Sequence, residues 1–241
     1  MPLLPSLLLF LLLALWTTPT IATVTVLSYQ STTTATKEIR VKNPSGHDPT
    51  GYPVYMWTTG TTMCKSGAYG QWRYSIDNAL ITAMSDRGYV SGAVDYSCFL
   101  YIASCEQLGT KVKGAYDATT ALNSAIEVMC AQPKANCSKG VAVHGFSQGA
   151  HVAAMAGRYD DRVTAALLFG NGNKLGGGFA SVSNCLRFGD STFAPPRRLP
   201  RERLRSIVGE TDGYFGSNMA GVKVQQKGST GYDCGENVDC I

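Results

Sequence analysis

VAVHGFSQGAHVAAMAG, residues 141–157, is the stretch that best indicates the fold, because an apolar run is followed by a glycine-containing pentapeptide and then by a run of small residues. Its apolar beginning, with Gly140 just before it, predicts a short buried strand from Gly140 to His144, and the small residues from Ala150 to Ala156 predict the start of a helix. The pentapeptide GFSQG joins the two, and its glycines leave room for a sharp turn in which bulky side chains would collide. Ser147, at the centre of that turn, is therefore predicted to project from the edge of a sheet.

A serine hydroxyl is a weak nucleophile at neutral pH and becomes effective when a neighbouring base takes its proton. The predicted strand, turn and helix around Ser147 are the context in which a GxSxG pattern carries such a nucleophile. This pattern resembles the nucleophile elbow of the α/β-hydrolase superfamily, and GFSQGAH is similar to the GYSQG-type elbows of cutinase-like and other secreted esterases. The resemblance covers most of the chain from Thr23, and it implies an α/β-hydrolase fold with a doubly wound, mostly parallel sheet.

The resemblance also implies a serine hydrolase that cleaves a carboxylic ester through an acyl-enzyme intermediate. The backbone N–H of Gln148, the residue after the serine, is then expected to form half of the oxyanion hole. In such enzymes the second N–H comes from the loop after the third strand, which corresponds here to residues 59–62, TGTT. Either Thr61, our first choice, or Thr62 is expected to supply that second donor.

The acid of the triad is expected in RSIVGETDGYFG, residues 205–216. A strand predicted from Leu204 to Gly209 leads there into a glycine-rich turn, similar to the GxxD turn that carries the acid in this superfamily. Asp212 is the predicted acid and Glu210 the alternative. Because Asp and Gly are ordinary turn residues, an acidic turn without chemistry remains the competing interpretation.

The base is the missing member of the triad. All three histidines, His47, His144 and His151, precede Asp212, whereas the order in the family is serine, acid, histidine. His144 is predicted to support the turn from the core, and the helix is expected to carry His151 away from the serine. We expect a chain that is incomplete at its carboxyl end; the alternative is a hydrolase-fold binding protein that has lost its base and about 10⁶ in turnover.

The rest of the chain alternates strand-like and helix-like segments, which is typical of a single α/β domain. Strands are predicted at Thr23–Tyr29, Thr36–Val41, from Gly51, at Tyr89–Tyr96, Gly140–His144, Arg162–Phe169 and Leu204–Gly209, and helices at Tyr74–Arg87, Asp117–Cys130 and from Ala150. A hydrophobic content of 44% and a charged content of 16% suit one globular domain over residues 23–241. The formal net charge of +4 is too small to indicate a nucleic-acid partner.

The first 22 residues have the layout of a secretory signal peptide, with an apolar run from Leu7 to Trp16 and a cleavage site after Ala22. That run is shorter than the roughly 20 residues that span a bilayer, so a secreted mature chain without a membrane span is expected over a membrane-anchored one. Export also suits the eight cysteines, an even number, which predict disulfides. Short spacings suggest the pairs Cys98–Cys105, Cys130–Cys137 and Cys234–Cys240, which leaves Cys64 with Cys185.

Cofactors are not expected, because the sequence contains no zinc-type CxxC spacing and no nucleotide, flavin or other metal motif. The partner is expected to be a small or polymeric ester. Its identity stays open among peptides, acyl lipids, cutin-like polyesters and acetylated sugars, because loop conformations shape the pocket.

Overall fold

The computed structural model describes residues 23–30, 36–61, 70–98, 102, 104–117, 123–172, 183–186, 199–209, 212–215 and 218–232. Within these residues, seven strands form one sheet in the order β1-β2-β4-β3-β5-β6-β7. The pairs β1/β2 and β2/β4 are antiparallel, and the strands from β4 to β7 run parallel to one another. The strands are β1 (Thr25–Gln30), β2 (Thr36–Lys42), β3 (Val54–Thr58), β4 (Val90–Val94), β5 (Val141–Phe146), β6 (Val163–Phe169) and β7 (Leu204–Ile207).

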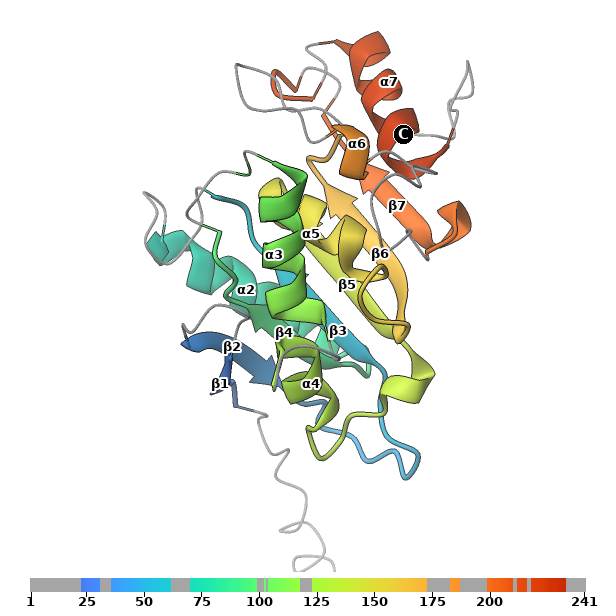
Figure 1. Cartoon of the computed structure of the whole chain (residues 1–241). Helices are drawn as coiled ribbons and strands as arrows, with labels where there is room; N and C mark the ends of the chain where they lie inside the picture. Colours follow the sequence, from blue (N-terminus) through green and yellow to red (C-terminus); the bar gives the residue numbers. More distant parts are fainter. Residues whose placement is uncertain are drawn as a thin grey trace, which may run out of the picture.

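Both faces of the sheet are covered by helices. Alternate side chains of a strand point to opposite faces of the sheet, and the side chains of β3 therefore pack into two separate hydrophobic cores. Val54 and Met56 join the large core with α3, α4 and α5, whereas Tyr55 and Trp57 pack with Ile81 of α2 on the other face. Figure 1 shows α3, α4 and α5 in front of the sheet and α7 beside β7. The helices are α2 (Gly70–Ser85), α3 (Cys105–Tyr116), α4 (Ala125–Cys130), α5 (Gln148–Ala156), α6 (Ser183–Leu186) and α7 (Met219–Thr230), with short 3-10 helices η2 (Cys137–Lys139) and η3 (Arg201–Arg203).

This architecture confirms the predicted fold class, a doubly wound, mostly parallel sheet of the α/β-hydrolase kind. Because β4 to β7 are parallel, the loops that follow them and β3 meet at one side of the sheet, called here the carboxyl edge. Ser147, which follows β5, lies at this edge. In the described part of the chain, no helix combines the length and the hydropathy that crossing a membrane requires.

The helix predicted over Asp117–Cys130 is wrong at the described residues before Ala125, and residues 118–122 lie outside the described part of the chain. Asp117 is the C-cap of α3, and α4 begins only at Ala125. Asn123 stands before it with φ of 76°, a left-handed conformation that Asn tolerates and that no α-helix contains. Helix α3 itself was not predicted, although its N-cap Ser104, whose side chain accepts a hydrogen bond from the amide of Gln107, is a recognisable start signal.

One predicted disulfide is confirmed and two are wrong. Cys130 and Cys137 are bonded, as their short spacing predicts. Cys105 bonds Cys185, at a sequence separation of 80 and a Cα–Cα distance of 5.6 Å, which excludes Cys98–Cys105 and Cys64–Cys185. The reason is tertiary, because α3 and α6 both pack against α5, and this brings their cysteines together. The predicted pair Cys234–Cys240, the signal peptide over residues 1–22, and the candidates Thr62 and Glu210 lie outside the described residues.

Candidate active site

Ser147 occupies a strained turn between β5 and α5. Its backbone φ is 53° and its ψ is −120°, and among the described residues Asn123 is the other non-glycine with a positive φ. Its amide donates to the carbonyl of Phe169 at 2.8 Å, which ties the turn to β6. Strained backbone of this kind persists where the surrounding structure holds it, and it concentrates at functional sites. The sharp strand-turn-helix predicted for residues 141–157 is therefore present.

The two glycines of the pentapeptide are required by backbone contacts. A Cβ on Gly145 would lie 2.2 Å from the carbonyl oxygen of Gly149, and a Cβ on Gly149 would lie 2.2 Å from that of Thr58. Both distances are far inside van der Waals contact. The Thr58 hydroxyl also donates to the Gly149 carbonyl at 2.9 Å. The end of β3 and the start of α5 are therefore in direct contact. This close approach brings the loop after β3 up to the serine.

Gln148 and Thr61, the two predicted oxyanion-hole residues, are in contact. Nε2 of Gln148 donates to the Thr61 hydroxyl at 2.8 Å, across the gap between the elbow and the loop after β3. Gln148 is the first residue of α5, and the N–H groups of a first helical turn point out of the helix end. That end carries a partial positive charge, which favours an anion. The arrangement is thus suited to hold negative charge beside Ser147.

Lys111, on α3, was missed by the sequence analysis. Its Nζ donates to Oε1 of Gln148 at 3.2 Å and to the carbonyl of Ser97, in the loop after β4. Burial, with a smaller contribution from the charge of Lys37, lowers the pKa of Lys111 to about 8. No motif marks this lysine, because its role depends on how α3 packs against α5.

Asp212 follows β7 at the carboxyl edge, as predicted for the acid. Its Oδ1 accepts from the amides of Tyr214 at 2.8 Å and Phe215 at 3.1 Å, and its own amide donates to the carbonyl of Gly209 at 3.0 Å. Within the described residues the carboxylate therefore caps a turn, and no hydrogen bond joins it to a histidine. The geometry fits both the acid and the competing turn interpretation.

His144 lies under the elbow, in the core, as its position on β5 predicts. Its Nδ1 shares a 2.6 Å hydrogen bond with the hydroxyl of Tyr55, and its ring packs edge-to-face against Trp57 and Phe169. Burial lowers the pKa of His144 to about 4, so the ring is neutral at physiological pH. Its contacts hold the end of β5 and leave it turned away from Ser147, consistent with a supporting role.

The remaining histidines also lie apart from the serine hydroxyl. His151 is completely buried one helical turn into α5, where its ring packs edge-to-face on Phe215 at a centroid distance of 5.7 Å. Burial lowers the pKa of His151 to about 4, against a smaller opposing effect of the Gly172 backbone. His47 is exposed in the loop between β2 and β3. The amide of His151 donates to the carbonyl of Ser147 at 3.3 Å, as in a helix, but in the described part of the chain no hydrogen bond joins a histidine ring to the Ser147 hydroxyl.

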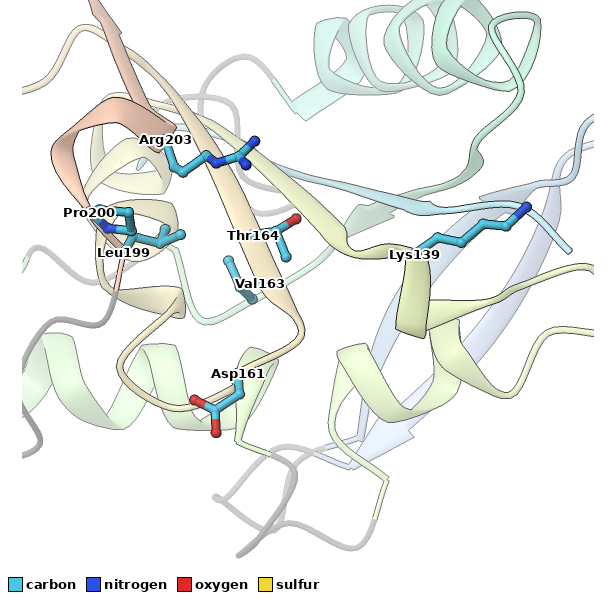
Figure 2. Close-up of a pocket in the computed structure, with 7 residues that line it drawn as sticks. All are labelled: Lys139, Asp161, Val163, Thr164, Leu199, Pro200 and Arg203. Carbon is cyan, nitrogen blue, oxygen red and sulfur yellow. The ribbon is translucent and has the colours of Figure 1, made fainter. Parts of the chain in front are cut away.

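A separate cavity of about 480 Å³ opens at the opposite edge of the sheet. Its lining comes from the segments that lead into β5, β6 and β7, including Lys139, Asp161 and Arg203 (Figure 2). Lys139 is paired there with Asp48 at 2.9 Å. Because these segments precede the strands and Ser147 follows one, the cavity is distinct from the candidate active site.

No protein-family model matches this chain, and no curated protein matches it. Among solved structures, Thermogutta terrifontis esterase 2 phosphorylated by paraoxon is 16% identical over 77% of this chain and 69% of its own, with a TM-score of 0.48. An acylaminoacyl peptidase in complex with Z-Gly-Gly-Phe-chloromethyl ketone is 12% identical over 80% and 32%, with a TM-score of 0.48. DcsB in complex with its substrate analogue is 15% identical over 65% and 48%, with a TM-score of 0.46, so this chain spans about half its length. Similarities at this level carry no argument about substrate or mechanism.

Proposed function

We propose that this protein is a secreted serine hydrolase that cleaves a carboxylic ester through an acyl-enzyme intermediate. The observation that carries the proposal is the strained Ser147, held with positive φ at the carboxyl edge between two glycines that backbone contacts require. Strain of this kind has a cost in folding free energy, and a serine in an ordinary turn has no need of it. The surrounding structure maintains the strained turn, and the turn in return projects the hydroxyl above the sheet, where it can react.

In the proposed reaction, Oγ of Ser147 bonds to the carbonyl carbon of the ester, and the bond from that carbon to the alkoxy oxygen breaks. The serine proton passes through a base to the departing alcohol, and water then releases the carboxylic acid and restores the serine. The N–H groups of Gln148 and Thr61 are assigned to the oxyanion, and Asp212 is assigned to orient the base. The base itself is assigned to none of the three histidines, because in the described part of the chain neither buried ring, of His144 or His151, bonds the Ser147 hydroxyl, and His47 is exposed in the loop before β3.

The proposal includes export of residues 23–241 after removal of residues 1–22. Two disulfides, Cys105–Cys185 and Cys130–Cys137, support it, since such bonds form and persist in oxidising compartments. The substrate is proposed to be a small or polymeric ester.

A binding protein with the hydrolase fold is the second candidate. It is favoured because the rings of His144 and His151 contact Tyr55 and Phe215 and, among the described residues, make no hydrogen bond to the Ser147 hydroxyl; a serine without a base keeps an oxyanion site and loses turnover. Such a protein would bind ester or carboxylate ligands at the carboxyl edge and release them unchanged.

Hydrolysis of 4-nitrophenyl acetate and butyrate separates the two candidates. A hydrolase turns over these esters, with an initial burst of nitrophenol where deacylation is the slow step, and Ser147→Ala abolishes both the burst and the turnover. Ser45→Ala, at an exposed serine in the loop after β2, is the matched control and retains both. A wild-type chain that hydrolyses neither ester, or hydrolysis that survives in Ser147→Ala, overturns the hydrolase proposal.

A further inference from the structure

Lys111 connects three loops at the carboxyl edge. From α3, its ammonium donates to the carbonyl of Ser97 in the loop after β4 and to Oε1 of Gln148 in the elbow. The other end of the Gln148 amide donates to the hydroxyl of Thr61 in the loop after β3. Two consecutive hydrogen bonds therefore connect Lys111 to Gln148 and Gln148 to Thr61, the two residues assigned to the oxyanion.

A neighbouring contact reinforces the same connection. The hydroxyl of Tyr96 donates to the carbonyl of Thr59 at 2.7 Å, and its ring centroid lies 6.0 Å from the ammonium of Lys111. The loops after β3 and β4 are thus held both to each other and to α3. A side chain at position 111 that lacked an N–H donor would leave the Gln148 amide oxygen without this contact.

The ammonium of Lys111 lies where its positive charge is disfavoured. The ammonium is half-buried, contacts the first residue of α5, whose end is already partly positive, and feels the repulsion of Lys37. Two residues along the same helix, Lys113 is exposed beside the Tyr159 ring. When negative charge develops on an oxyanion near this ammonium, the attraction between the two reduces the unfavourable electrostatic energy.

We propose that Lys111 is a positioning residue for the oxyanion hole, which holds the Gln148 side chain and through it Thr61. This inference rests on the proposed hydrolase function. Lys111 sets the separation of the two N–H donors and adds positive potential to the site, and it makes no bond to the substrate carbonyl.

The first test measures how fast a fluorophosphonate probe modifies Ser147, a reaction in which the Oγ–P bond forms and the P–F bond breaks. Rates at several probe concentrations separate probe affinity from bond formation. Lys111→Met, which keeps the length and loses the N–H donors and the charge, is expected to slow bond formation about 10- to 100-fold with little change in affinity. Lys111→Arg restores most of the rate, and Lys113→Met on the same helix retains it in full.

The second test observes the contact itself through the side-chain amide signals of Gln148 in 15N-labelled full-length protein. The pair of signals that disappears in Gln148→Glu belongs to Gln148. Titration from about pH 6 to about pH 11.5 extends past the free lysine value and moves these signals with an inflection near the pKa of Lys111, about 8. The inflection persists in Lys113→Met and vanishes in Lys111→Met.

The outcomes distinguish this inference from the function on which it rests. If the wild-type chain fails to react with the probe, the proposed function is wrong, and the role of Lys111 falls with it. If the wild type reacts and Lys111→Met reacts as fast as Lys113→Met, only the role of Lys111 is wrong. An inflection of the Gln148 signals that remains in Lys111→Met also overturns it, because another group then titrates beside Gln148.

Discussion

Positions 145 and 149 of the elbow have room only for glycine. We expect Gly145→Ala and Gly149→Ala each to lower the free energy of unfolding by at least about 3 kcal/mol, because the new Cβ would meet main-chain atoms that have no room to move. Urea denaturation measures the loss. Gly209→Ala, whose Cβ would meet no atom within 4 Å, is the control and is expected within about 0.5 kcal/mol of the wild type. Wild-type stability of Gly145→Ala would show that the turn is looser than described.

Asp212→Asn separates the acid from the turn interpretation. The Asn oxygen can still accept from the amides of Tyr214 and Phe215, so the substitution is expected to keep the turn and the stability. If Asp212 orients the base, the loss of its charge lowers turnover by a factor on the order of 10⁴. Esterase kinetics and urea denaturation on the same preparation make the comparison. Unchanged kinetics in a stable variant identify Asp212 as a turn residue.

The buried histidines predict how stability falls in acid. Burial lowers the pKa of His144 and of His151 to about 4, whereas a histidine in the unfolded chain titrates near 6.5. Below pH ~6.5 the unfolded chain therefore binds more protons, and stability falls until about pH 4, by on the order of 2 to 3 kcal/mol per histidine. Urea denaturation at about pH 7 and about pH 4.5 measures this loss.

His151→Leu is expected to lose less stability than the wild type over that interval, since it removes one of the two buried groups at similar volume. His47→Gln changes an exposed histidine and retains the wild-type dependence. Equal losses in His151→Leu and the wild type would mean that other groups cause the acid sensitivity.

The two disulfides differ in how much they restrict the unfolded chain. Cys105–Cys185 joins α3 to α6 across 80 residues, whereas Cys130–Cys137 closes a loop of 7. Loop-closure entropy predicts stabilisation of about 4.5 kcal/mol from the first and about 2.5 kcal/mol from the second. Double Cys→Ser replacement at each pair, followed by urea denaturation, checks the order. A larger loss at Cys130–Cys137 contradicts it.

Most elements of the sheet could be predicted from the sequence, because their signals are local. Strands such as Val54–Thr58 and Val141–Phe146 are short apolar runs bounded by turn residues, and those patterns survive folding. The break at Asn123 was missed because an apolar spacing over Asp117–Cys130 continues through it, and a single left-handed residue leaves no periodic signal. Cys105–Cys185 was missed because short spacing favours local pairs, whereas packing on α5 joins distant ones.

Across the whole molecule, parallel strands bring the candidate site together from distant parts of the chain. The sharp turn at Ser147 is the one that the elbow pattern predicts. Gln148 and Thr61, to which the same pattern assigns the oxyanion, follow neighbouring strands, and their side chains are in contact. Lys111 could not be predicted in the same way. Its contact with Gln148 depends on the angle at which α3 crosses the edge, and sequence spacing contains no information about that angle.

The strained serine is the basis of the proposed function, and its reactivity can be measured in one experiment. The protein is incubated with a fluorophosphonate, and the modified peptide is identified by mass spectrometry beside Ser147→Ala and Ser45→Ala. A nucleophilic serine predicts a single phosphonyl group, on the peptide that contains Ser147, absent from Ser147→Ala and retained in Ser45→Ala. No adduct on the wild type, or an adduct that remains in Ser147→Ala, would contradict the proposal of a serine hydrolase.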